Sequence, residues 1–307
     1  MGKNNNKLQT SLEYAAVRVM LAIFGFLPRP LAVSTGRGLG RIAYAFAGRL
    51  RRTGLRNLEM AFPEMSQRER ERIVHGCFLS LGRQLGEFSQ LPRATPESLH
   101  RIVDCVGLEN LEAAQQRGKG VLLFTGHLGA WELSSFALAA FGYPLSFIVR
   151  RLDNERIEPL VEKVRSRFGN QTIDKFTSPR RLLRTLREGK TLGVLVDLNT
   201  HPPGAVFVDF FGVPAATTTG LANLALRTES VVLPVFAAWD NERSRFVLHV
   251  DPPLEITRTN DMEEDVRRLT AAVTSVIETY VRRFPDQWLW IHKRWNTRPP
   301  GEANLYQ

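Results

Sequence analysis

The sequence predicts an α/β fold, in which a mixed, largely parallel sheet is flanked by helices and preceded by an apolar, membrane-associating helical segment. Two observations carry this prediction. From residue 120 onward, short runs rich in Val, Leu and Phe alternate with helical segments, which is typical of a parallel sheet covered on both faces. Before that point the chain is expected to be helical, and its first sixty residues combine apolar stretches with positive charge.

The N-terminal segment is expected to contain two apolar helices. The run at 14–27, YAAVRVMLAIFGFL, is apolar except for Arg18, and Pro28 ends it. At about 1.5 Å per residue this run reaches roughly 21 Å, short of a bilayer core near 30 Å. A second apolar stretch follows at 39–50. We therefore expect a helical hairpin that enters one leaflet of a membrane, although a buried helix pair would give a similar pattern.

Positive charge is concentrated in the same segment. Residues 1–60 hold ten Lys and Arg residues against two Glu residues, a net charge of +8, whereas the whole chain carries +10. Nucleic acid and anionic membrane both attract such a segment, and its apolar helices favour the membrane over nucleic acid. Cys77 and Cys105 form no CxxC pair, which favours a reducing, cytosolic setting.

Helices are also expected between this segment and residue 117. Residues 64–90 form the longest of them, with Ser66 as its N-cap, and Pro96 starts another. We divide the chain into a basic N-terminal segment, 1–60, and a single α/β domain, 61–307. That domain comprises a helical lead-in, 61–117, and a catalytic core, 118–307.

The core is expected to alternate between strands and helices. The predicted strands are Val121–Thr125, Leu145–Val149, Gly193–Val196, Val231–Ala237 and Arg245–Val250. The predicted helices lie near 131–141, 154–168, 178–188 and 218–228, with a last long helix at about 261–284.

One glycine-rich run, GRGLG at 36–40, has the spacing of a dinucleotide-binding loop. No strand precedes it, and no acidic residue stands about twenty positions later, where Arg56 lies. Small residues in a helix near a membrane explain the run better.

The stretch TGHLGAWE, at 125–132, holds the candidate catalytic residues. Gly126 and Gly129 permit a tight turn between a strand and a helix, with His127 in the loop and Glu132 in the first helical turn. In that arrangement the imidazole can take a proton from a hydroxyl group while a carboxylate holds its other ring nitrogen. No Ser or Cys stands beside His127 as an enzyme nucleophile, so we expect the substrate's hydroxyl to attack directly. Free N–H groups at the helix start are expected to meet the oxyanion.

GHLGAWE fits the H-x4-D/E motif, and the chain resembles the bacterial late acyltransferases of lipid A biosynthesis, within the glycerolipid acyltransferases. The resemblance also rests on RNLEMAFPEMS at 56–66, FIVRRLDN at 147–154, VLVDLN at 194–199, VFVDFFGVPAATTTG at 206–220 and DQWLWIHKRWNTRP at 286–299. It implies a glycerolipid acyltransferase-like fold, an acyl carrier protein as donor and a lipid A precursor as acceptor. It also implies the cytoplasmic face of the inner membrane as location, with no metal and no further cofactor.

The resemblance carries roles to individual residues. His127 resembles the general base and Glu132 its orienting partner. Arg150 resembles an arginine that binds a substrate phosphate or steadies the oxyanion. The substrate-binding candidates further along the chain are Asp197, Asn199, Phe211 and Gly212; Asp197 follows a strand, where open α/β sheets place their sites. Packing roles are expected for Trp288, Trp290 and His292.

Three alternatives stay open. The acceptor could be another glycolipid such as a mannoside, a lysophospholipid or an amino-acid lipid, because the residues inside the motif, Leu128–Trp131, depart from the bulkier family pattern. The chain could be an acyl hydrolase, with water in place of the acceptor. It could also be a basic membrane scaffold without activity, in which His127 serves only stability.

Overall fold

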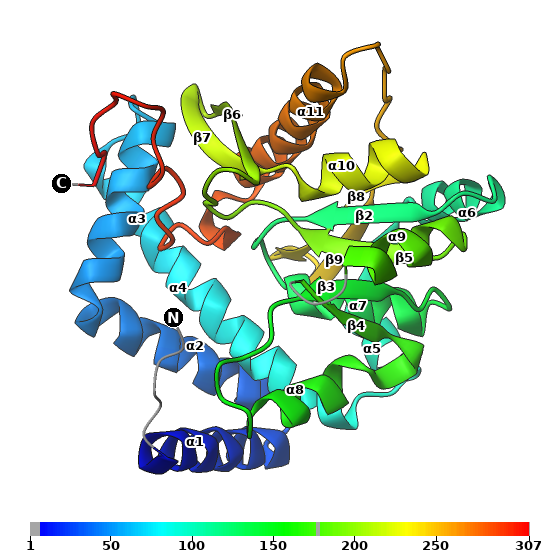
Figure 1. Ribbon diagram of the computed structural model, residues 1–307. Coiled ribbons are helices and arrows are strands. Elements are labelled where there is room, and N and C mark those ends of the chain that lie inside the picture. The colour runs from blue at the N-terminus through cyan, green and yellow to red at the C-terminus, as the bar shows by residue number, and fades with distance from the viewer. Residues whose placement is uncertain (1–6, 176–178, 307) are drawn as a thin grey trace.

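The computed structural model describes residues 7–175 and 179–306. A seven-stranded sheet lies at its centre, with strand order β1-β9-β8-β2-β5-β3-β4, and a two-stranded hairpin, β6–β7, stands apart (Figure 1). The strands are β1 Val103–Val106, β2 Val121–Thr125, β3 Ser146–Val149, β4 Gln171–Asp174, β5 Thr191–Leu195, β6 Ala205–Phe210, β7 Val213–Thr218, β8 Val231–Asp240 and β9 Arg245–Val250.

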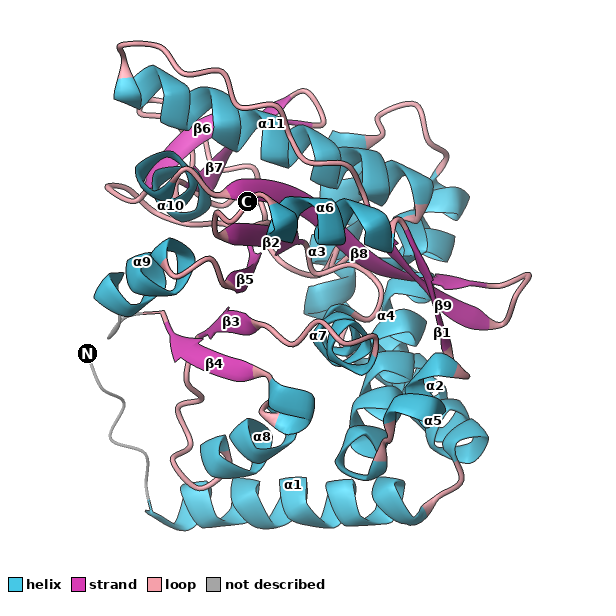
Figure 2. Cartoon of the chain, turned by 90° about the vertical axis from the view of Figure 1, so that its right-hand side faces the viewer, coloured by secondary structure: helices cyan, strands magenta, loops and turns pink. Residues whose placement is uncertain are grey.

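The helices cover both faces of this sheet and extend to one side of it (Figure 2). They are α1 Lys7–Phe26, α2 Arg29–Phe46, α3 Gly48–Ala61, α4 Gln67–Gln90, α5 Pro96–His100, α6 Leu108–Gln116, α7 Trp131–Ala140, α8 Glu158–Arg165, α9 Pro179–Arg187, α10 Gly220–Thr228 and α11 Met262–Arg283. The short 3-10 turns are η1 Leu91–Arg93, η2 Arg167–Gly169 and η3 Pro285–Gln287.

Every pairing in the large sheet is parallel except that between β8 and β9. The sheet is therefore mixed and largely parallel, as predicted from the alternation of strands and helices. The five predicted strands are all present. Strands β1 and β4 and the β6–β7 hairpin were not predicted. Residue 178, the first of the predicted helix near 178–188, lies outside the described residues.

Two apolar cores lie on opposite faces of the sheet. One contains side chains of α5, α6 and α7 with Leu123 and Leu145. The other contains side chains of α4, α10 and α11 with Leu122 and Phe124. Adjacent residues of β2 thus point to opposite faces, and both faces are buried, which accounts for the continuous apolar run that the sequence shows there.

The caps of the long helices agree with their sequence signals. Ser66 and Glu69 form a reciprocal capping box at the start of α4. The Asp261 carboxylate accepts hydrogen bonds from the N–H groups of Glu263 and Glu264 at the start of α11.

The glycines of the GRGLG run bring α2 against α4. A Cβ on Gly36 would lie 2.1 Å from the carbonyl oxygen of Gly82, and one on Gly40 would lie 2.3 Å from that of Phe78. The two helical backbones therefore touch, as helices with small residues four apart commonly do. This contact explains the run without a nucleotide, and it gives α2 a partner in α4 rather than in α1.

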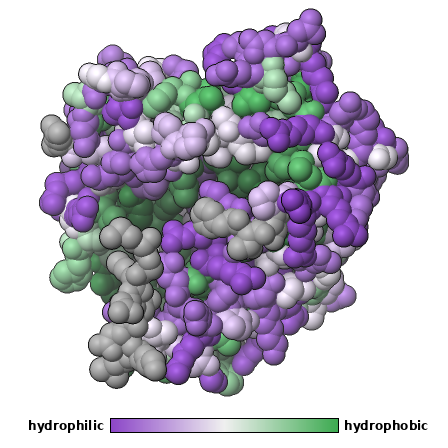
Figure 3. All heavy atoms as spheres, viewed as in Figure 1, coloured by the Kyte–Doolittle hydropathy of each residue, from purple (hydrophilic) through white to green (hydrophobic). Residues whose placement is uncertain are grey.

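The N-terminal helices also expose large apolar side chains. The most exposed of these on α1 and α2 are Phe26 and Phe46, at 76% and 85%. Figure 3 shows apolar surface at the edge of the molecule where Figure 1 places the α2–α3 junction, and in a band across the same face. Within the described residues, no helix is both long enough and apolar enough to cross a membrane.

Candidate active site

The sheet places His127 beside Asp197. Strands β2 and β5 are parallel neighbours in which Thr125 pairs with Leu195. His127 and Asp197 each stand two residues beyond this pair, so both lie at the carboxyl edge of the sheet. Open α/β sheets build their sites at this edge.

Asp197 holds His127 through two hydrogen bonds. Its carboxylate lies 2.7 Å from Nδ1 of the imidazole and accepts a second bond of 2.7 Å from the backbone N–H of His127. A third donor, Nε1 of Trp288, lies 2.8 Å away. An ionised carboxylate only accepts hydrogen bonds, so Nδ1 carries the proton and Nε2 presents its lone pair.

The environment keeps Asp197 ionised. The carboxyl is buried, and burial acts to raise its pKa. The electrostatic attraction of the His127 ring and the hydrogen bonds from His127 and Trp288 act in the opposite direction and outweigh burial, so the pKa of Asp197 lies below its ordinary value. The site therefore supplies a fixed negative charge beneath the imidazole.

Both glycines of the loop are required by close contacts. A Cβ on Gly126 would lie 2.9 Å from the Asp197 carboxylate. Gly129 has a φ of +61°, and a Cβ there would lie 2.0 Å from the carbonyl oxygen of Ala237 in β8. These contacts explain why the turn around His127 contains glycine at both positions.

The C-terminal segment that follows α11 forms backbone hydrogen bonds with the same loop. The N–H of Leu289 donates to the carbonyl of His127 at 3.0 Å, and the N–H of Gly129 donates to the carbonyl of Gln287 at 3.0 Å. Asn57 of α3 in turn donates to the carbonyls of Trp290 and His292. The RNLEMAFPE and DQWLWIH stretches thus lie in contact, and hydrogen bonds with the second stretch fix the backbone of the His127 loop.

Glu132 does not bond His127, which corrects the predicted partner of the imidazole. Its carboxylate accepts a 3.2 Å hydrogen bond from Nε of Arg165, and a second bond from the same guanidinium completes a forked ion pair. Glu132 does lie in the first helical turn, as predicted, because α7 begins at Trp131. Its side chain points toward α8, and Asp197 occupies the place beside the imidazole instead.

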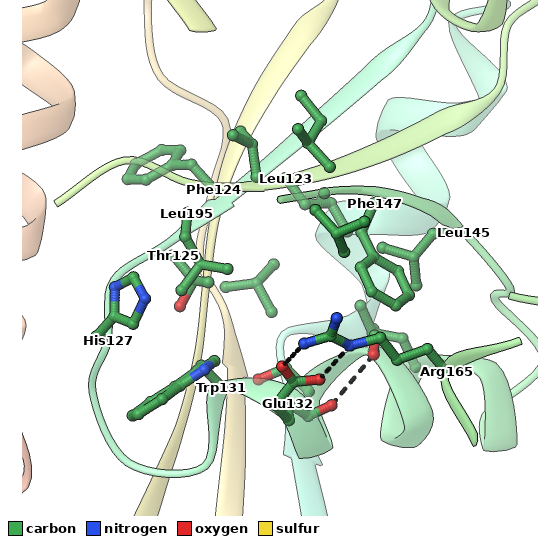
Figure 4. A pocket seen from close by; sticks show the side chains of 18 of the residues that line it. Leu123, Phe124, Thr125, His127, Trp131, Glu132, Leu145, Phe147, Arg165 and Leu195 are labelled. Atoms are coloured by element: carbon green, nitrogen blue, oxygen red, sulfur yellow. Dashed lines mark hydrogen bonds and ion pairs between the residues drawn. The ribbon is translucent and has the colours of Figure 1, made fainter. Parts of the chain in front are cut away.

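Two cavities meet at His127. The first, of about 220 Å³, lies between the sheet and α7 (Figure 4). Leu123, Leu145 and Phe147 line it, with the Glu132–Arg165 pair along one side, and His127 and Trp131 stand at one end. The second, of about 460 Å³, lies between the sheet edge and helices α9 and α10.

Arg150 stands where the two cavities join and lines both. Its side chain is 67% exposed and forms an ion pair of 3.0 Å with Asp153. Arg150 thus lines the same two cavities as His127, and its role in binding substrate stays a prediction.

Three other predicted substrate-binding residues lie elsewhere. The N–H of Asn199 donates to His292 Nε2 at 3.0 Å, and its side chain bonds Thr297, so Asn199 joins the loop after β5 to the C-terminal segment. Phe211 and Gly212, with φ of +59° and +75°, form the tight turn between β6 and β7. The Phe211 ring is buried against Phe62. None of the three lines either cavity, and their role in binding substrate stays a prediction.

The residues that the sequence reasoning missed are Arg165 and the polar role of Trp288. Arg165 is one arginine among many on amphipathic helices, and no local signal marks it. The position of Asp197 after a strand was a sequence signal for a site residue, but its pairing with His127 depends on β2 and β5 being neighbours in the sheet. Among the described residues, no cluster of His, Cys, Asp and Glu side chains has the arrangement of a metal site.

The site thus combines an imidazole held by a buried carboxylate, at the carboxyl edge of an α/β sheet, with a largely apolar cavity. A family model described as bacterial lipid A biosynthesis acyltransferase matches residues 3–297. The chain is 29% identical over 305 residues to the lipid A biosynthesis palmitoleoyltransferase of Escherichia coli K12, covering 96% of this chain and 97% of that protein. It is also 29% identical to the myristoyltransferase of that bacterium, covering 85% and 81%, and to its lauroyltransferase, covering 91% and 90%. The chain therefore belongs to the bacterial lipid A biosynthesis acyltransferase family and is an acyltransferase.

Proposed function

We propose that this enzyme transfers a fatty acyl chain from an acyl carrier protein to a hydroxyl group of a lipid A precursor, with His127 as general base. The observation that carries the proposal is the Asp197-held imidazole at the junction of two cavities. Family membership supports the acceptor class, because the relatives are named for lipid A acylation.

The reaction follows from the tautomer of the imidazole, in which Nδ1 carries the proton and Nε2 can accept one. Nε2 of His127 takes the proton of the acceptor hydroxyl as the oxygen attacks the thioester carbonyl of the donor. Asp197 stabilises the imidazolium that forms. When the tetrahedral intermediate collapses, the carbon–sulfur bond breaks and the imidazolium returns the proton to the leaving thiolate. No covalent bond to the enzyme is needed.

The oxyanion is assigned to the first turn of α7. The N–H groups of His127, Gly129 and Ala130 are already used by Asp197, Gln287 and Ala237. That leaves the N–H groups at the start of α7, at residues 131–133, which have no intrahelical acceptor because they open the helix. Arg150 adds a positive charge at the junction of the cavities.

We place the enzyme on the cytoplasmic face of the inner membrane, with α1 and α2 against anionic lipid. Apolar side chains exposed on these two helices support this, together with the +8 charge of residues 1–60. The basic charge also suits an acidic carrier protein and a phosphorylated acceptor. No cofactor beyond the acyl carrier is proposed.

The test compares four purified, detergent-solubilised proteins: the wild type, His127→Ala, Asp197→Asn and Glu132→Gln. Each is mixed with acyl carrier protein bearing a labelled C12 or C14 chain, with and without a tetra-acylated lipid A precursor, and the label is followed. His127→Ala and Asp197→Asn should each lower kcat by about 10²–10⁴, because the first removes the base and the second removes the charge that orients it.

Glu132→Gln is the matched control, because this carboxylate stands five residues from His127 and does not touch the imidazole. It should retain far more activity than Asp197→Asn when both variants unfold at similar temperatures. Equal losses of activity in the two variants would indicate that Glu132 also orients the imidazole. Label released as free acid without acceptor would favour the hydrolase alternative, and label moving only to a mannoside or lysophospholipid would replace the acceptor. Full activity of His127→Ala would refute the mechanism.

A further inference from the structure

We propose that Gly193 sets the length of the acyl chain that the enzyme accepts, because Leu145 lies over the place of its missing side chain and an added Cβ would push that leucine into the inner part of the first cavity. The proposal rests on the proposed function, since it concerns the acyl donor of that reaction. It names a specificity-determining residue that lies away from the reacting atoms.

The register of the sheet gives the cavity a depth. Leu195 pairs with Thr125 beside the His127 loop and forms the outer row of side chains. Two residues further in, Gly193 pairs with Leu123 on one side and with Phe147 on the other. At about 3.3 Å per residue, this inner row lies roughly 7 Å deeper along the strands.

Residues of both rows line the first cavity, so an acyl chain bound with its carbonyl at His127 would run inward past Leu195 to Gly193. Leu123 and Phe147 supply side chains to the inner row, whereas Gly193 between them supplies none. The strand at Gly193 therefore adds no side chain of its own to this part of the cavity wall.

The atom nearest to the missing Cβ of Gly193 belongs to Leu145, whose side chain can rotate. A Cβ at this position would lie 2.9 Å from Cδ1 of Leu145 and 3.4 Å from Cβ of Phe147. Leu145 is buried and lines the same cavity. The end of a leucine side chain can rotate away from an added methyl group, and both groups would then take up room that is now open.

Charge separates the two cavities and assigns the acyl chain to the first. The second cavity carries Lys175 and Arg227 on its lining in addition to Arg150, which the two share. A phosphorylated acceptor is anionic and fits that lining. The inner walls of the first cavity are largely apolar, apart from Ser134, Ser135 and the mutually neutralised Glu132–Arg165 pair, and an alkyl chain gains from burial there.

The main experiment measures kcat/KM for acyl carrier protein loaded with C8, C10, C12, C14 and C16 chains, at a fixed acceptor concentration, for the wild type and Gly193→Ala. We expect Gly193→Ala to lower kcat/KM for the longest chain that the wild type uses well by about tenfold or more. One methylene in an apolar pocket changes kcat/KM by roughly 10–200-fold. Shorter chains and the KM for the acceptor should be unchanged.

A second substitution makes the prediction specific. In Gly193→Ala/Leu145→Val the side chain that meets the new methyl group lacks its δ carbons, so the long-chain activity should return. Gly38→Ala in α2 is the matched control, because a Cβ there meets nothing within 4 Å, and its chain-length profile should equal that of the wild type.

Parallel loss of activity for every chain length in folded Gly193→Ala would overturn the proposal, and so would failure of the double variant to recover. If Gly193→Ala does not fold, Phe147→Leu supplies the test, because it enlarges the inner row and should favour longer chains; an unchanged profile would refute the idea. The proposed function fails separately, if the wild type moves no acyl group from the carrier to the lipid acceptor.

Discussion

His127 is held by residues that are far from it in the sequence. Asp197, which binds both its backbone and its ring, stands 70 positions later. Trp288, which holds Asp197, stands another 91 positions on. By contrast Glu132, the acid nearest in the motif, serves an ion pair with α8. At the scale of single residues, proximity in the motif and proximity in space lead to different partners, and strand register decides between them.

His292 gives the enzyme a pH-dependent stability. Its Nε2 accepts the N–H of Asn199, so the ring is neutral on that side. Burial lowers the pKa of His292, the neighbouring charges of Arg294 and His127 lower it further, and Asp197 opposes them. The folded state therefore resists protonation, while in the unfolded chain a histidine binds a proton as pH falls through about 6.5.

We expect this group to make the free energy of unfolding fall as pH drops below about 6.5, by at most about 1.4 kcal/mol per pH unit. The check is denaturant unfolding at pH 7.5, 6.5 and 5.5. In His292→Gln, the side-chain carbonyl can accept the same N–H without titrating, so the slope in this window should be shallower. Identical slopes in the two proteins would show that His292 does not titrate differently on folding.

At the scale of elements, the contact between α2 and α4 depends on backbones that approach where side chains are missing. Gly36 and Gly40 stand four apart on α2 and face Gly82 and Phe78 on α4. The same run was separable from a nucleotide loop by sequence alone, because no strand precedes it. The helix that packs against this run could not be predicted from the sequence, because several helices could have offered a complementary small residue.

Gly40→Ala should destabilise the enzyme by about 1–3 kcal/mol, because the added Cβ would lie 2.3 Å from a carbonyl oxygen of α4 and the helices would have to part. Gly38→Ala, two residues away on the same helix, meets nothing and should stabilise by up to about 1 kcal/mol through helix propensity. Chemical unfolding in one detergent measures both. Similar effects from the two substitutions would contradict the close contact.

At the scale of the whole molecule, we propose two functional surfaces. Helices α1 and α2 face lipid, and the carboxyl edge of the sheet carries the reaction. The apolar residues exposed on α1 and α2 include Val19, Ile23, Phe26, Leu31, Leu39, Ile42 and Phe46. The acceptor is itself a lipid, so a protein that sits on the membrane surface reaches it without extracting it from the bilayer.

The enzyme should bind vesicles that contain phosphatidylglycerol better than pure phosphatidylcholine vesicles, and less well at high salt, because exposed Lys and Arg contact the head groups. Replacing Phe26 and Phe46 by Ser should weaken binding by about tenfold or more for each ring, as expected for losing a buried aromatic side chain. Sedimentation with vesicles measures this.

Val106→Ser is the control for an exposed apolar residue on the sheet, where Val106 is 50% exposed. It should leave vesicle binding unchanged. Equal binding by the Phe26→Ser/Phe46→Ser protein and the wild type would refute the assignment of α1 and α2 to the membrane.

The sequence by itself determined the elements whose signals are local. Apolar runs identified the strand Val121–Thr125 and the long helices, Ser66 marked a helix start, and the glycines around His127 predicted its turn. Such features depend on a few neighbouring residues, so a linear pattern is enough to specify them. The short strands β1 and β4 gave too little periodicity to be recognised.

Only the tertiary structure decided which of these residues meet. The order of strands brought Asp197 rather than Glu132 to the imidazole. The fold also placed Phe211 in a buried turn away from the cavities, and it put Gly193, which has no side chain, between Leu123 and Phe147. The physical reason is that strand pairing and helix packing join segments through contacts between their faces, and a local pattern shows that a face is apolar without specifying what covers it.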